Sequence, residues 1–328
     1  MARRGGPPHT MTNEPAIRLA SRDAGSASDA AQAAAKSKGK SAVEDMSDEL
    51  ALTDEAAFLE SSTREFPVPP ALTQHGPARV IAMCNQKGGV GKTTSTINLG
   101  AAMAGYGRRV LLVDLDPQGA LSVGLGVPVY TIERTIYDVL MGDVTAAEVV
   151  MHTSVPGLDL IPSNIGLSAA ELALVTEVGR EYVLQGALRD LAQVYDVILI
   201  DCQPSLGLLT VNALAAADSV IIPLECEYFA LRGVALLQQT IEKVKSRINP
   251  RLEIEGLLPT KYDARTVHTR EVLGRVREAF GDQVFDTTIS RTIKFPETSS
   301  AGLPITAYAP TSTAAQQYMR LAREVLDR

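Results

Sequence analysis

The stretch N-Q-K-G-G-V-G-K-T-T at residues 85–94 decides the fold. It follows an apolar run, R-V-I-A-M-C at residues 79–84, and it opens a segment with helical spacing. Glycines let the backbone approach a phosphate closely, so that N–H groups and the following helix N-terminus face the anion. Lys92 supplies charge to the β- and γ-phosphates, and the Thr93 hydroxyl is placed to ligate Mg²⁺. The residues that we expect to bind nucleotide are Gly88, Gly89, Val90, Gly91, Lys92, Thr93 and Thr94.

This loop departs from the usual phosphate-loop pattern, because Gln86 stands where a glycine is expected and Lys87 adds a second lysine. The form K-G-G-x-G-K-T resembles the deviant Walker loop of the ParA/MinD family of ATPases. In that family the first lysine reaches the nucleotide of the other subunit. The resemblance therefore implies a homodimer in the ATP state, with Lys87 and Lys92 among the catalytic residues.

Composition limits the alternatives. With 328 residues, 45% of them hydrophobic, the chain can bury a sizeable core. A net charge of −7 gives no overall positive potential that would attract nucleic acid. Three cysteines without C-x-x-C spacing predict buried, reduced thiols. No apolar run predicts a membrane span or a signal peptide, so we expect a cytoplasmic protein.

The first part of the chain differs from the rest. Residues 1–75 are rich in Ala, Ser, Gly, Pro and charge, which predicts a disordered arm. Residues 1–40 carry seven Lys/Arg against three Asp/Glu, and residues 41–75 carry one against eight. The arm is either a tether for a partner or DNA, or a solvated tail. We expect residues 76–328 to form the folded domain.

Beyond residue 79, short apolar runs alternate with longer amphipathic segments, which is typical of repeated βαβ units. The fold class is therefore α/β, with a doubly wound, mostly parallel sheet and nucleotide at the carboxyl ends of the strands. The predicted strands are 79–84, 109–114, 158–162, 196–201, 219–223 and 254–261. The predicted helices are 93–106, 168–194, 231–248, 269–280 and 312–326.

Two acids follow the second predicted strand, in V-L-L-V-D-L-D-P-Q-G at residues 110–119. Asp114 and Asp116 are spaced i, i+2, so both would leave the strand end near the phosphates. The D-x-D-P-Q-G run resembles the A′ motif of the ParA family. That match implies that Asp116 positions or polarises the attacking water, and that Asp114 supports the magnesium shell.

A third acid closes the aliphatic run V-I-L-I at residues 197–200. Asp201 at this strand end reads as a Walker B carboxylate, which can hold Mg²⁺ through water. The predicted metal site is thus Thr93, Asp114 and Asp201, and the cofactors are ATP and Mg²⁺. The family usually reads D-x-P-P here, whereas this chain has Gln203 in place of the first proline.

The resemblance narrows to the chromosomal ParA/Soj pattern through residues 205–233 and 262–272, and it covers about residues 78–325. Residues 289–297 and 302–304 resemble the loop beside adenine, with Ser299 where the family often has proline. Between Lys243 and Lys294, eleven basic residues face seven acidic ones. This region is either a solvated helix face or a site for DNA phosphates. The DNA-binding candidates are Arg265, Arg270, Arg275, Arg277, Arg291 and Lys294.

The leading interpretation is a partition ATPase that dimerises on ATP, binds double-stranded DNA non-specifically on the nucleoid, and hydrolyses ATP slowly until a ParB-like partner stimulates it. Three alternatives remain. A MinD-like positioning ATPase would need a basic amphipathic helix for lipid, which residues 312–328 do not resemble. A metabolic relative would be an iron–sulfur reductase or a carboxylate-phosphorylating ligase. A scaffold on the nucleoid would bind ATP and hardly hydrolyse it.

Overall fold

The computed structural model describes residues 64–227 and 230–328. Within these residues, seven strands form one sheet in the order β3-β4-β2-β5-β1-β6-β7. All neighbouring strands run parallel, apart from the antiparallel pair β3 and β4. The strands are β1 Arg79–Met83, β2 Val110–Leu115, β3 Met151–His152, β4 Leu158–Ile161, β5 Val197–Cys202, β6 Ser219–Glu225 and β7 Glu253–Thr260.

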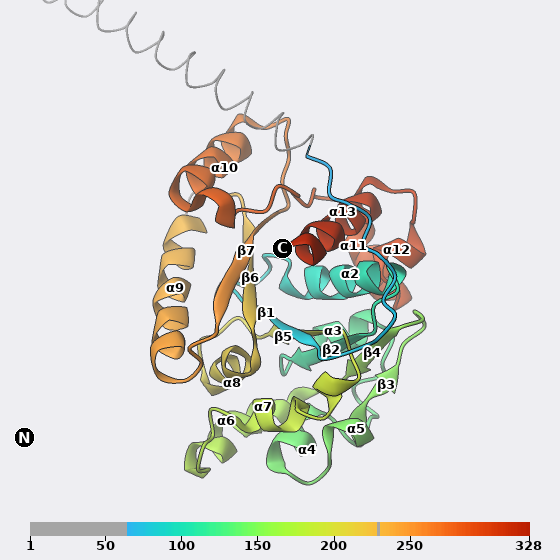
Figure 1. The fold of residues 1–328 in the computed structure, drawn as a ribbon, viewed down its shortest axis with the longest axis vertical. Helices are drawn as coiled ribbons and strands as arrows, with labels where there is room; N and C mark the ends of the chain where they lie inside the picture. Colours follow the sequence, from blue (N-terminus) through green and yellow to red (C-terminus); the bar gives the residue numbers. More distant parts are fainter. Residues whose placement is uncertain (1–63, 228–229) are drawn as a thin grey trace, which may run out of the picture. The chain divides into compact units, whose positions relative to one another are not determined.

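Helices cover both faces of this sheet, as expected for a doubly wound fold (Figure 1). The helices are α2 Lys92–Gly105, α3 Ala120–Gly124, α4 Ile136–Met141, α5 Ala146–Val149, α6 Ala170–Ala173, α7 Val183–Leu188, α8 Leu208–Ala216, α9 Ala230–Arg247, α10 Val267–Phe280, α11 Lys294–Ala301, α12 Ile305–Tyr308 and α13 Thr313–Asp327. Short 3₁₀ turns are η1 Ile165–Ala169, η2 Leu174–Thr176, η3 Leu191–Gln193 and η4 Gly281–Gln283.

Each face of the sheet has its own hydrophobic core, because successive strand residues point to opposite faces. In β5, Ile198 and Ile200 join the core under α4, α6, α7, α8 and α9. Val197 and Leu199 join the other core, under α2, α12 and α13. Burial on both faces explains why these strands read as unbroken apolar runs.

The six predicted strands are all present, with ends that differ by one or two residues. The long helix predicted at 168–194 is wrong, since η1, α6, η2, α7 and η3 divide that segment. Gly179 lies there at φ +70°, in a turn between η2 and α7. The prediction also missed the two-residue strand β3 and the helices α3, α4, α5, α8, α11 and α12.

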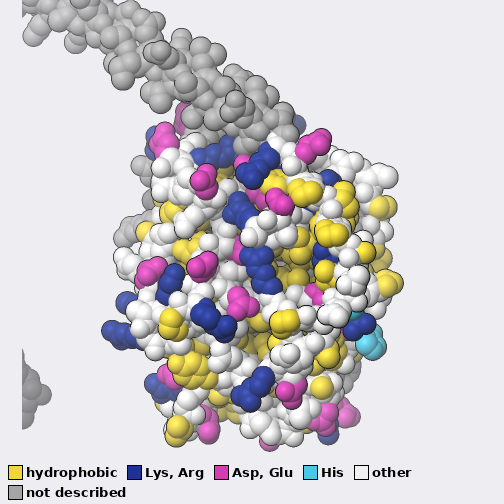
Figure 2. All heavy atoms as spheres, viewed as in Figure 1, with side chains coloured by type: hydrophobic (Ala, Val, Ile, Leu, Met, Phe, Trp, Pro, Cys, Tyr) yellow, Lys and Arg dark blue, Asp and Glu magenta, His cyan; other side chains and the backbone are white. Residues whose placement is uncertain are grey.

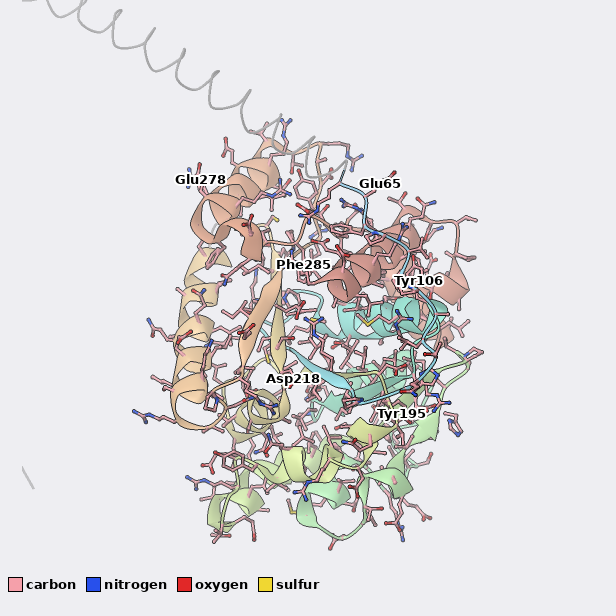
Figure 3. The ribbon with its side chains drawn as sticks, in the orientation of Figure 1. Glu65, Tyr106, Tyr195, Asp218, Glu278 and Phe285 are labelled. Carbon is pink, nitrogen blue, oxygen red and sulfur yellow. The ribbon has the colours of Figure 1, made fainter. Side chains whose placement is uncertain are left out.

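We call residues 64–78 the N-terminal strap, because they lie along the surface of the domain. Phe66 is buried, with the guanidinium groups of Arg64 and Arg320 at 5.3 and 5.4 Å from its ring centroid. Arg108 donates a hydrogen bond of 2.8 Å to the Pro70 carbonyl. Figure 3 labels Glu65 near the start of the strap and Tyr106 beside its course. The arm predicted to end at residue 75 thus includes residues that pack on the domain, while residues 1–63 lie outside the described part.

The C-terminal helix α13 packs against α2 with Leu321 and Val325 fully buried. It is therefore a helix docked on its own domain. Among the described residues, no helix combines the length and the apolarity needed to span a membrane.

Candidate functional site

The loop at residues 85–91 joins the central strand β1 to α2 with the conformation that an anion site needs. Gly89 and Gly91 have φ values of +75° and +87°, in the left-handed region that favours glycine. Gly91 is the N-cap of α2 and provides no side-chain cap. The N–H groups of the first turn are therefore available to an anion, and the helix dipole favours negative charge there.

Side chains from the loop and from neighbouring strands hold this conformation. The Asn85 amide donates to the Pro223 carbonyl at 2.7 Å, and its oxygen accepts from the Lys87 backbone N–H at 2.9 Å. Thr260, at the end of β7, donates its hydroxyl hydrogen to the carbonyls of Val90 and Leu224 at 2.7 and 3.0 Å. The loop is thus tied to the carboxyl ends of β6 and β7.

The Walker B carboxylate lies directly beside the first turn of α2. Thr93 Oγ1 donates to Asp201 Oδ2 at 2.7 Å, and Thr96 Oγ1 donates to Asp201 Oδ1 at 3.3 Å. Asp201 is fully buried, and Lys92 is only 6% exposed. A hydroxyl and a carboxylate in contact fit Mg²⁺, which takes one or two protein oxygens and keeps several waters. Thr93 and Asp201 are therefore the residues that could hold the metal.

The two acids at the end of β2 have different surroundings. Asp114 is fully buried, and its carboxylate accepts hydrogen bonds from Ser122 N, Ser122 Oγ and Asp116 N, at 2.9, 2.7 and 3.2 Å. These bonds hold the turn that leads to α3. Asp116 is half-buried and lines the cavity described below. Asp114 therefore orients the turn, while Asp116 faces the space where a reaction would occur.

The buried carboxylates have altered acidity. Burial raises the pKa of Asp114 to about 6, against the opposing effect of its hydrogen bonds from Ser122. Burial, followed by the nearby charge of Asp114, raises the pKa of Asp201 to about 8. The Thr93 hydroxyl and the Lys92 ammonium act in the opposite direction on Asp201. A cation at this site would favour the ionised carboxylates.

A cavity of about 660 Å³ opens above the loop. Its walls come from the loop and α2 on one side and from the predicted adenine loop on the other, with Pro204 and Asp116 between them. Val90 is buried beneath it. The lining residues are Gly88, Gly89, Gly91, Lys92, Thr93, Thr94, Asp116, Pro204, Thr260, Lys261, Ile289, Ser290, Arg291, Thr292, Ile293, Phe295, Pro296, Ser299 and Tyr318.

Lys87 does not line this cavity. Its ammonium contacts the Glu227 carboxylate and lies 3.7 Å from a Glu225 oxygen. Glu225 also pairs with Lys261 at 3.3 Å and with Arg291 at 3.4 Å. Our sequence reasoning assigned no role to these two acids. The signal was present, because they stand at the end of β6 with the i, i+2 spacing that drew attention to the acids at the end of β2.

The six basic residues predicted to bind DNA differ in their surroundings. Arg291 lines the cavity, and Lys294 begins α11 beside it. Arg277 is partly buried on α10, with its NH2 nitrogen enclosed. The exposed members are Arg265, Arg270, Arg275 and Arg291. Figure 2 shows Lys and Arg side chains interspersed with Asp and Glu on the face that it displays.

Arg265 is the most constrained of the exposed group. Its guanidinium makes two hydrogen bonds of 2.9 Å to the Asp263 carboxylate, and these bonds lower the pKa of Asp263 to about 2. A DNA phosphate would have to compete with that carboxylate. Arg270 and Arg275, on the outer side of α10, have the clearer access to solvent.

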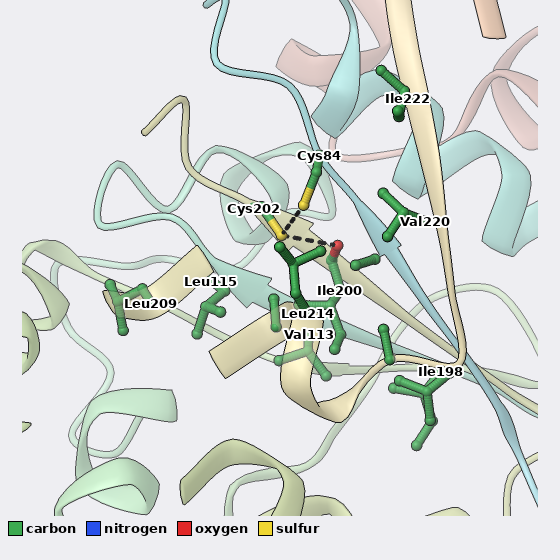
Figure 4. Packing of buried hydrophobic residues seen from close by; sticks show 14 of the residues in the cluster. Cys84, Val113, Leu115, Ile198, Ile200, Cys202, Leu209, Leu214, Val220 and Ile222 are labelled. Atoms are coloured by element: carbon green, nitrogen blue, oxygen red, sulfur yellow. Dashed lines mark hydrogen bonds between the residues drawn. The ribbon is translucent and has the colours of Figure 1, made fainter. Parts of the chain in front are cut away.

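The three cysteines are free and buried, as predicted. Cys84 and Cys202 end adjacent strands, with their sulfur atoms 3.0 Å apart inside the core (Figure 4). Burial raises the pKa of Cys226 to about 12. Enclosed thiols of this kind cannot reach a cluster shared between two subunits, which counts against the iron–sulfur alternative.

Comparison with known proteins decides the family. A family model described as an AAA domain matches residues 78–254. The chromosome partitioning protein ParA of Caulobacter vibrioides is 48% identical over 254 residues, which make up 77% of this chain and 95% of that protein. The sporulation initiation inhibitor protein Soj of Bacillus subtilis is 48% identical, over 75% of this chain and 98% of that protein. The chain belongs to the ParA/Soj family.

Other members extend the comparison. An uncharacterized protein of Mycobacterium tuberculosis is 63% identical over 81% of this chain and 84% of its own length. Among solved structures, cobyrinic acid a,c-diamide synthase from Mycobacterium smegmatis with bound ADP and magnesium has a TM-score of 0.68. It is 42% identical, covering 76% of this chain and 94% of that chain. The family membership and the P-loop fold predicted from the sequence are thus confirmed.

Proposed function

We propose that this ParA/Soj family member is an ATPase that partitions DNA, using ATP and Mg²⁺. Binding of ATP would select a homodimer in which Lys87 of each subunit reaches the nucleotide of the other. That dimer would bind double-stranded DNA without sequence preference, which would place the protein in the cytoplasm on the nucleoid. Hydrolysis, stimulated by a ParB-like partner, would release it.

The proposed chemistry is transfer of the γ-phosphoryl group to water. Asp116 orients the water and accepts its proton, while the bond between the γ-phosphorus and the ADP oxygen breaks to give ADP and phosphate. Lys92 and the loop N–H groups stabilise the negative charge that develops on the phosphate oxygens. Magnesium held by Thr93 and Asp201 would neutralise further charge on the β- and γ-phosphates.

One observation carries this proposal: the phosphate loop, Asp116 and Thr93, whose hydroxyl contacts the buried Asp201, meet at a single cavity. DNA binding is supported more weakly, by the exposed arginines of α10. The partner and the location come from family membership alone.

The test compares ATP turnover with gel shift of a non-specific duplex, in ATP or ADP and at two salt concentrations. We expect DNA binding to require ATP, to vanish in Lys92→Ala, and to persist without hydrolysis in Asp116→Ala. Salt should weaken the complex strongly, because phosphate contacts release counterions. A protein that ignores DNA in every nucleotide state would contradict the proposal.

A second candidate, an amide-forming ligase, is favoured by the similarity to cobyrinic acid a,c-diamide synthase. A ligase would consume ATP only when its carboxylate substrate and a nitrogen donor were present. We expect the turnover of this protein to be unchanged by cobyrinic acid with glutamine and to increase with DNA and a ParB-like protein. The reverse pattern would make the ligase the correct assignment.

A further inference from the structure

We call residues 203–207, between β5 and α8, the switch loop. This loop forms part of the wall of the cavity. Pro204 from this loop lines the cavity together with Asp116 and Gly88. Only Cys202 separates this loop from the Walker B residue Asp201. A shift of this loop therefore changes the wall of the cavity nearest to the proposed general base.

One side chain from outside the loop contacts both of its ends. Glu171, on α6, accepts a hydrogen bond from Gln203 Nε2 at 3.0 Å. The same carboxylate oxygen accepts from the Leu209 backbone N–H at 3.4 Å. Gly207 lies so close that a Cβ added there would be 2.1 Å from Glu171 Oε1. The carboxylate is thus enclosed between the beginning and the end of the switch loop.

The position of Glu171 also suits the first turn of α8. Gly207 is the N-cap of this nine-residue helix and makes no side-chain cap. A carboxylate near a helix N-terminus is stabilised by the dipole and by the otherwise unpaired N–H groups. Glu171 therefore replaces the missing cap from a distant part of the sequence.

Other hydrogen bonds of the loop stay within it or join it to α8. In the described part of the chain, Ser205 N donates to Gln203 O at 2.9 Å, Gly207 N donates to Ser205 Oγ at 3.3 Å, and Thr210 Oγ1 on α8 donates to Ser205 O at 2.7 Å. These bonds shape the loop without fixing it to any element beyond α8. Glu171 provides the attachment to a separate element.

We propose that Glu171 is a positioning residue for ATP hydrolysis, acting through Gln203 and the N-terminus of α8 to hold the switch loop beside the γ-phosphate position. This inference rests on the proposed ATPase function. It also explains Gln203, which stands where the family usually has proline: the amide supplies by a hydrogen bond the restriction that a proline ring supplies covalently.

The test compares Glu171→Ala and Glu171→Gln with Glu177→Ala, which changes an exposed acid on the same segment. Three quantities are measured: kcat for ATP, affinity for a fluorescent ATP analogue, and amide hydrogen exchange over residues 203–211. We expect Glu171→Ala to lower kcat about tenfold and to speed exchange in the switch loop, with nucleotide affinity within about twofold. Glu171→Gln keeps an acceptor oxygen, so kcat should recover to within about threefold of the wild type.

A second background sharpens the test. In Gln203→Pro the loop is restricted without Glu171, so adding Glu171→Ala should lower kcat only about threefold. Unchanged exchange and kcat in Glu171→Ala would overturn the inference. A parallel loss of kcat, nucleotide affinity and thermal stability would also overturn it, because that pattern indicates a general structural role. Wild-type protein without ATP turnover would instead overturn the proposed function itself.

Discussion

The phosphate-loop region was predicted from motifs, and the C-terminal basic region, residues 243–294, from an excess of basic residues. The two regions differ in how closely the structure brings their predicted residues together. Around the loop, the side chains predicted from motifs lie close to one cavity, apart from Lys87. Among the six basic residues, two lie at or beside that same cavity, one is partly buried, and three are exposed near α10. The spacing of residues along strands predicts where their side chains lie in the fold, whereas a local excess of basic residues does not.

The physical reason is the regularity of the sheet. Asp114 of β2 and Met83 of β1 are both in register with Asp201 of β5, so the residues that follow these strands emerge side by side. The basic residues have no such common frame. They occupy a turn, a helix and the adenine loop, and among the described residues only single contacts such as the bridge between Tyr262 and Ser290 bring the turn and the adenine loop together.

The largest expected effect is at the metal pair. Thr93→Val removes the hydroxyl that contacts Asp201 and keeps the side-chain shape, so Mg²⁺-dependent ATP turnover should fall about 100-fold. The matched control is Thr96→Val, which removes the other hydroxyl on Asp201 and should cost about threefold or less. Equal losses in the two variants would mean that the Thr93 hydroxyl has no special role in holding metal.

A second prediction concerns the pH dependence that Asp201 gives to the free energy of unfolding. The pKa of Asp201 is raised in the folded state, so folded protein binds a proton that unfolded protein has already released between about pH 4 and pH 8. Stability from this group therefore falls as pH rises through that window. Asp201→Asn does not titrate, so its advantage in Tm over the wild type should grow from pH 5 to pH 8.

The same variant tests the metal assignment. Magnesium and ATP should raise the Tm of the wild type and should raise that of Asp201→Asn much less. A Tm difference that stays constant across this pH range would show that Asp201 has an ordinary pKa in the folded protein.

For the basic region we expect a smaller effect on DNA affinity. Replacing both Arg270 and Arg275 with Glu should weaken DNA binding about tenfold and reduce the salt slope by about 2, because two phosphate contacts are lost. Replacing both Lys243 and Arg247 on α9 with Glu is the control for the same change in net charge. Arg265→Ala should change affinity less than either single α10 variant, since Asp263 already pairs with that guanidinium. A stronger effect at Arg265 would mean that DNA displaces Asp263.

The smallest effect is expected at the contacts of the Lys87 ammonium with the carboxylates of Glu225 and Glu227. The two regions meet here, because Glu225 also pairs with Arg291. Glu227→Gln weakens the hold on Lys87 within its own chain, so dimerisation with a non-hydrolysable ATP analogue should improve by about threefold or less. Glu278→Gln, on the exposed side of α10, serves as the control. Sedimentation of the two variants at several protein concentrations measures the change, and weaker dimerisation of Glu227→Gln would show that this acid assists the dimer.

Much of the fold could be predicted, because strands buried on both faces leave strong apolar runs. The segment from residue 168 to residue 194 could not, since its apolar residues have helical spacing while Gly179 and three 3₁₀ turns interrupt the chain. Helix α8 was missed because L-L-T-V-N-A-L-A-A is apolar on most sides and has little helical contrast.

Within the site, Lys92, Thr93, Asp116 and Asp201 could be located from motifs. The contacts of Glu171 with Gln203 and Leu209 could not, because they join parts of the chain 32 and 38 residues apart. Ion pairs between side chains of different loops leave no periodic pattern. This is why the pairing of Glu225 and Glu227 with Lys87 became visible only in the folded structure, although the spacing of the two acids was present in the sequence.

The N-terminal strap has a practical consequence for the limits of the domain. A fragment that begins at residue 76 would lack Phe66, whose ring lies beneath the guanidinium groups of Arg64 and Arg320. It would also lack His75, whose Nδ1 lies 2.8 Å from Asp196 Oδ2. Its Arg108 would also lose the Pro70 carbonyl. The smallest fragment that keeps these contacts begins at residue 64, so trimming experiments should remove residues up to 63 and no further.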